Sequence, residues 1–81
     1  MRRMNSRASV ALRAWMADRS ASQEGAARLL SDRLGRPVAQ TTVSRALRGS
    51  VPRGDVMSAL QAIAGIRIEW WSEPASATEA A

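Results

Sequence analysis

Apolar residues recur at helical spacing in four stretches of the chain, and residues typical of turns separate these stretches. Positions three, four and seven apart share one side of a helix, so each stretch predicts an amphipathic helix. The predicted helices span about residues 6–19, 22–34, 39–48 and 55–64. Their inward-facing residues would be Ala8, Leu12 and Trp15; Ala26, Ala27, Leu30 and Leu34; Val43 and Leu47; and Val56, Leu60 and Ile63. The pattern therefore predicts an all-α fold.

The period of the pattern changes after the fourth predicted helix. In "IRIEWW", residues 66–71, Ile66, Ile68 and Trp70 alternate with Arg67 and Glu69. This alternation is strand spacing and predicts a short C-terminal strand, although six residues leave a helical turn open. Residues 72–81 are mostly Ala, Ser, Glu and Thr, a composition that predicts a disordered tail. We thus expect a flexible basic arm at residues 1–7, one folded domain at 8–71, and the tail at 72–81.

Composition excludes several classes of protein. The 81 residues contain no cysteine and no histidine, which removes disulfides, thiolate metal sites and imidazole bases. The seven carboxylates form no paired arrangement and no glycine-rich phosphate loop is present, so we expect no enzyme, no metal and no cofactor. No small-molecule ligand is evident either. No apolar stretch approaches membrane-spanning length, and the lack of cysteine fits a cytoplasmic location, at the nucleoid if the partner is DNA.

Positive charge is concentrated in the first two thirds of the chain. Residues 1–53 hold eleven arginines against three carboxylates, a net charge of +8, whereas residues 54–81 carry a net charge of −3. This asymmetry indicates a polyanionic partner for the first part, while a merely basic surface remains the alternative. All twelve cationic side chains are arginine, whose planar fork suits phosphate and guanine.

The third predicted helix has a narrow apolar edge, formed by Val43 and Leu47, and its other sides are polar. These polar residue types match the edges of bases: glutamine suits adenine, arginine suits guanine, and threonine suits a phosphate or a thymine methyl group. The candidate base-reading residues are Gln40, Thr41, Thr42, Ser44 and Arg45. An ordinary solvated helix surface is the alternative, but such surfaces favour Glu, Lys and Ala. We therefore expect this helix to lie in the major groove of double-stranded DNA.

Four features of the sequence belong together: "SQEGAARLL" at residues 22–30, "QTTVSRALRG" at 40–49, Pro52, and "ALQAIAGI" at 59–66. Together they resemble the lambda-repressor/Cro-like (XRE-type) helix-turn-helix family. The resemblance covers about residues 8–71 and implies a compact domain of four to five helices. It also implies that Ala27 packs against Val43 and that Gln23 contacts a phosphate. The residues that match the family's base-reading positions are Gln40, Thr41, Thr42 and Arg45, with Ser44 and Arg48 nearer the DNA backbone. Arg36, Arg48 and Arg53 are further candidates for phosphate contacts.

This sequence departs from the tight form of that motif in one respect. Sixteen positions separate Ala27 from Val43, which lengthens the connection before the third helix, and Ala39 stands where a capping Ser or Thr is usual. The stretch "GRPVAQTTVSRAL" is also similar to the DNA-binding domain of arginine repressors, which have a longer connection. That domain continues into a β-wing, whereas "GDVMSALQAIAG" is helix-like and fits the Cro-like family better. Both resemblances imply DNA binding.

A single module of this size buries too little surface to be selective, so we expect a homodimer on a palindromic operator. Ile66, Ile68, Trp70 and Trp71 are the candidate interface residues. The function predicted is a sequence-specific transcriptional regulator, a repressor of phage, plasmid or mobile-element type. The alternatives are an antitoxin or recombination accessory factor, and a protein-interaction module that uses the surface of Trp70 and Trp71.

Overall fold

A computed structural model describes residues 6–74, which fold into four α-helices and one short 3-10 helix. The helices are α1 (Arg7–Asp18), α2 (Gln23–Leu34), α3 (Gln40–Leu47), α4 (Gly54–Ala64) and the 3-10 helix η1 (Ile68–Ser72). This confirms the all-α fold class. None of these helices has the length and apolarity needed to cross a membrane, a finding that covers residues 6–74.

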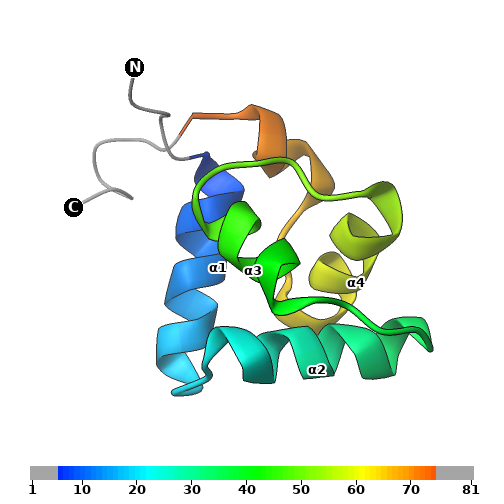
Figure 1. Cartoon of the computed structure of the whole chain (residues 1–81). Coiled ribbons are helices and arrows are strands. Elements are labelled where there is room, and N and C mark those ends of the chain that lie inside the picture. The colour runs from blue at the N-terminus through cyan, green and yellow to red at the C-terminus, as the bar shows by residue number, and fades with distance from the viewer. Residues whose placement is uncertain (1–5, 75–81) are drawn as a thin grey trace.

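Figure 1 shows α2 across the bottom of the view, with α1 rising near its N-terminal end and α4 lying above its C-terminal half. The helix α3 lies between them and packs against both α1 and α2. The short η1 packs against α1 and α4. The contacts with α1 and α2 cover one side of α3, and its remaining sides lie at the surface.

Local sequence sets most helix ends. Ser6 and Ser22 are N-caps whose hydroxyls accept the backbone N–H three residues further on, at 3.1 and 3.0 Å. These bonds satisfy donors that the first turn of a helix leaves unpaired. Gly35 and Gly65 end α2 and α4 in the left-handed conformation, with φ of 71° and 69°. A side chain is disfavoured in that conformation, which explains glycine at both ends.

The core is drawn from all four α-helices and from the C-terminal segment. Leu12, Leu30, Val43, Leu60 and Ile66 are its largest apolar side chains that are almost wholly buried. The smaller or slightly less buried members are Ala8, Met16, Ala26, Ala27, Ala46, Leu47, Val56, Ala59 and Trp71. The predicted stripes are thus largely in the core. Trp15, Leu34 and Ile63 are only partly buried and pack against its edge.

The prediction of a C-terminal strand was wrong, because residues 68–72 form η1. A strand needs a neighbour to pair its backbone groups, and this segment bonds locally instead. The N–H of Trp70 donates to the carbonyl of Arg67 at 3.1 Å, and the N–H of Glu73 donates to that of Trp70 at 3.2 Å. The alternation of apolar and polar residues in "IRIEWW" therefore does not correspond to the two faces of a sheet.

The turn of η1 places the four predicted interface residues differently. Ile66 and Trp71 are 1% and 4% exposed and lie in the chain's own core. Trp70 is half-buried, with the guanidinium of Arg7 4.2 Å from the centre of its ring. Ile68 remains at the surface, 40% exposed.

The two ends of the described segment meet. The N–H of Arg7 donates to the carbonyl of Glu73 at 2.8 Å, and the side chains of the same residues form an ion pair at 3.2 Å. Ser6 and Pro74 form an isolated bridge beside them. The folded unit thus extends from Ser6 to Pro74, beyond the predicted range of 8–71. The rest of the predicted arm and tail, residues 1–5 and 75–81, lies outside the described residues.

Candidate nucleic-acid interface

The helix α3 has one buried side and one side open to solvent. Val43, Ala46 and Leu47 are buried at 2%, 3% and 9% exposure. Gln40, Thr41 and Arg45 are exposed, and Thr42 and Ser44 are partly buried. All five candidate base-reading residues thus lie on α3 outside its buried edge. The three residues whose side chains are freest to meet a ligand are Gln40, Thr41 and Arg45.

A serine of α2 helps to hold the connection before α3. The hydroxyl of Ser31 donates to the carbonyl of Ala27 and accepts the N–H of Val38, both at 2.8 Å. This pair of bonds ties residues 35–39 to α2 and so fixes where α3 begins. Ala39 is the N-cap of α3 and makes no side-chain bond. The lengthened connection predicted from the sequence is therefore ordered, and α3 begins at Gln40.

Three further hydrogen bonds hold the C-terminal end of α3. A guanidinium nitrogen of Arg13, on α1, donates to the carbonyl of Leu47 at 3.2 Å. The carbonyl of Arg45 accepts the N–H groups of Arg48 and Ser50 at 3.1 and 3.0 Å. A cation at a helix C-terminus is favourable because the last carbonyls carry partial negative charge. No local signal in the sequence assigned Arg13 this role.

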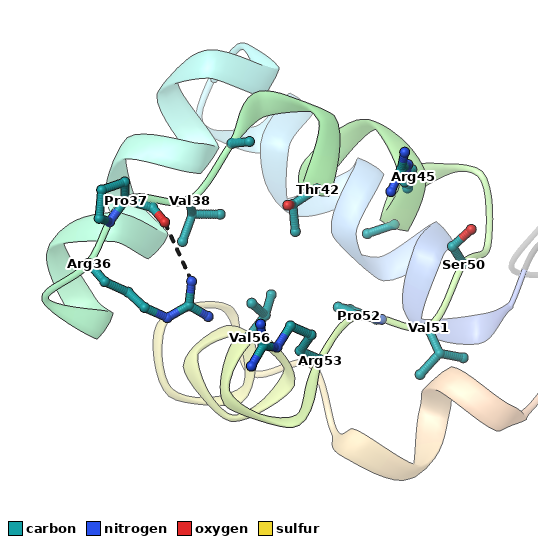
Figure 2. Close-up of a pocket in the computed structure, with 12 residues that line it drawn as sticks. Arg36, Pro37, Val38, Thr42, Arg45, Ser50, Val51, Pro52, Arg53 and Val56 are labelled. Atoms are coloured by element: carbon teal, nitrogen blue, oxygen red, sulfur yellow. Dashed lines mark hydrogen bonds between the residues drawn. The ribbon is translucent and has the colours of Figure 1, made fainter.

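A groove of about 530 Å³ runs beside the exposed side of α3. Figure 2 shows residues 36–38 on one side of this groove, Thr42 and Arg45 from α3, and residues 50–53 with α4 on the other. Its lining residues are Arg36, Pro37, Val38, Ala39, Thr42, Arg45, Ala46, Ser50, Val51, Pro52, Arg53 and Val56. Three of these carry positive charge and none carries negative charge. The surface next to α3 is thus hollow, and its lining combines three arginines with apolar side chains.

Val51 is a residue of this surface that sequence reasoning missed. Its side chain is 59% exposed, the highest value among the large apolar residues that lie exposed in the structure. A valine in a turn carries no periodic signal, because neither helical nor strand spacing applies there. Only the folded chain places Val51 in the groove beside α3.

Arg36, a candidate phosphate contact, is engaged inside the protein. Its Nε donates to Oδ2 of Asp55 at 3.1 Å, and its NH2 group donates to the same oxygen. Its NH1 group donates to the carbonyl of Pro37 at 3.4 Å, the contact drawn in Figure 2. The bond from Arg36 lowers the pKa of Asp55 below its ordinary value. Arg36 is therefore less available to a DNA phosphate than the sequence predicted.

The other candidate phosphate residues are placed differently. Arg48 is exposed, and its NH2 group donates to the hydroxyl of Ser44 at 2.8 Å. Arg53 is exposed, lines the groove and is the N-cap residue of α4. Gln23 is the first residue of α2 and is partly buried, and it does not line the groove.

Gln40 lies at a second hollow, of about 330 Å³, between α2 and the start of α3. Glu24, Ala27, Arg28, Ser31 and Val38 line this hollow with it. Three of the five base-reading candidates thus line a hollow, Thr42 and Arg45 the first and Gln40 the second, whereas Thr41 and Ser44 line neither of these two. Within residues 6–74, no group of three or more acidic side chains is arranged to hold a metal ion.

Comparisons with known proteins identify no relative. No protein-family model, no curated protein and no solved structure matches this chain.

Proposed function

We propose that this protein is a sequence-specific regulator of transcription that binds double-stranded DNA and reads the major groove with α3. One observation carries the proposal. The helix α3 is packed on one side, tied down at both ends, and presents Gln40, Thr41 and Arg45 to solvent beside a cationic groove. A major groove about 12 Å wide admits an α-helix, and these residue types match base edges within it.

The same surface offers contacts to the DNA backbone. Arg48 and Arg53 are exposed on either side of the turn that follows α3. From there they can reach DNA phosphates while α3 lies in the major groove of the DNA. Contacts of this kind supply most of the affinity and fix the register, whereas base contacts supply the sequence preference. Gln23, at the N-terminal end of α2, is the third candidate for a phosphate contact.

A two-fold dimer would double the recognition surface. Two copies of α3 would then enter successive turns of the major groove, so that the half-sites lie about 34 Å apart or at a multiple of that distance. Ile68 and Trp70 are the predicted interface residues that still reach the surface. A repressor that occupies an operator in this way needs no catalytic group and no cofactor.

The alternative function, a protein-interaction module that uses the surface of Trp70 and Trp71, has less support. Trp71 is buried, and the ring of Trp70 is partly covered by Arg7. These two rings therefore offer a partner protein little free aromatic surface. An antitoxin or recombination factor would use the same DNA-binding surface as a regulator.

Selection of duplexes from a random pool at about 150 mM salt, followed by sequencing, tests the proposal. Enrichment of a palindromic sequence is the expected result, and the distance between its halves reports the geometry of the dimer. Weak, salt-sensitive binding with no enriched sequence would contradict the proposal.

A further inference from the structure

One ion pair at the edge of the groove joins parts of the chain that are nineteen positions apart. Arg36 lies in the connection between α2 and α3, and Asp55 lies in the first turn of α4. The two side chains are 40% and 39% exposed, so the pair lies at the surface where a ligand can reach it. It is not part of the hydrophobic core.

The pair occupies one anion-binding edge of the Arg36 guanidinium. An arginine binds a carboxylate or a phosphate with two parallel N–H groups. In Arg36 the Nε and NH2 groups, which form one such edge, both donate to Asp55. The remaining terminal nitrogen, NH1, donates to the carbonyl of Pro37. A DNA phosphate would have to displace the carboxylate of Asp55 to bind this edge.

We propose that Asp55 withholds Arg36 from DNA, so that Arg36 does not count among the phosphate contacts of the wild-type protein. Asp55 thereby sets the sequence-independent part of the affinity at the DNA-binding surface. This inference rests on the proposed function, because DNA is the anion for which Asp55 competes. It assigns Arg36 to holding the connection before α3 and leaves the contacts with the DNA backbone to Arg48, Arg53 and Gln23.

The electrostatics of phosphate binding give the size of the effect. Each phosphate contact adds about 0.9 to the slope of log K against log salt, which is about an eightfold gain in affinity at 0.1 M salt. Asp55→Asn removes the charge that holds Arg36 and keeps the shape of the side chain. This variant should bind a duplex of scrambled sequence about eightfold more tightly at 0.1 M salt, with a slope steeper by about one unit.

The experiment measures affinity for that scrambled duplex between about 50 and 200 mM salt, for wild type and four variants. Asp55→Asn should show the steeper slope. Arg36→Ala should keep the wild-type slope, because Arg36 is already withheld. The double variant should also keep the wild-type slope, because the released arginine is gone. Asp32→Asn removes an exposed carboxylate of α2 and is the matched control for net charge. Its affinity for the scrambled duplex should rise far less than that of Asp55→Asn.

Four results would overturn the inference: an unchanged slope in Asp55→Asn, a slope shallower by about one unit in Arg36→Ala, a gain that persists in the double variant, or an equal gain in Asp32→Asn. Melting curves for every variant establish that each is folded at the assay temperature. Failure of the proposed function is a separate observation, since it would appear as the absence of an enriched sequence in the selection from random duplexes.

Discussion

Replacing Arg45 by alanine tests the proposed recognition of DNA separately from folding. The side chain of Arg45 is exposed and makes no hydrogen bond or ion pair with another residue of the described part of the chain. Its backbone carbonyl, which accepts two bonds from the turn after α3, is retained in the variant. Alanine is also the best helix former. We therefore expect the free energy of unfolding to change by less than about 0.5 kcal/mol.

The effect on DNA binding should be large by comparison. A bidentate contact between arginine and a guanine edge contributes about 1–3 kcal/mol of discrimination. Loss of that contact would weaken binding to the selected operator by about 5- to 150-fold, since 1.4 kcal/mol corresponds to a factor of ten. Binding to a scrambled duplex should change much less, so the ratio of the two affinities is the informative quantity.

Fluorescence anisotropy with labelled operator and scrambled duplexes measures this ratio, and urea unfolding measures stability. Arg67→Ala is the matched control, because Arg67 is exposed, carries the same charge and lies before η1, away from the groove. If Arg45→Ala weakened both duplexes equally, or no more than Arg67→Ala does, the assignment of Arg45 to base reading would be refuted. If it unfolded the chain, the assumption that its side chain has no structural role would be wrong.

Two further predictions concern stability. Leu60 is 1% exposed, so Leu60→Ala should lower the free energy of unfolding by about 2–5 kcal/mol in urea titration; a loss below about 0.5 kcal/mol, the size of a surface substitution, would contradict the burial of this side chain. The bond from Arg36 lowers the pKa of Asp55 from its ordinary value of 3.8, so the ionised carboxylate stabilises the fold above that value and this contribution is lost as the pH falls through the lowered pKa. Arg36→Ala should therefore reduce the loss of thermal stability between neutral pH and pH of about 3, and an unchanged loss would show that the pair does not couple to folding.

Much of the fold could be predicted because helical spacing and helix ends are local properties of the sequence. The predicted range 22–34 matches α2 closely, since Ser22 and Gly35 mark its two ends. The start of α3 at Gln40 could be predicted only to within a residue, because Ala39 provides no side-chain cap. The candidate base-reading residues follow directly from that helix, as they lie outside its apolar edge.

What the sequence could not indicate depends on contacts between distant residues. "IRIEWW" alternates like a strand, but Ile66 and Trp71 are both buried because the chain turns between them. Arg36 is of a residue type that binds phosphates, but only the folded chain brings Asp55 to its guanidinium. Arginine is equally suited to a carboxylate and to a phosphate, so residue type alone does not distinguish the two roles.

The measurement that tests the central claim most directly is a selection from random duplexes carried out with wild type and with Gln40→Ala side by side. Glutamine prefers adenine through two hydrogen bonds in the major groove. If α3 reads bases, the wild-type sequence motif should contain a preferred base in each half-site that Gln40→Ala no longer selects, while the other positions are kept. A motif that is unchanged by the substitution, or that weakens evenly at every position, would contradict the account.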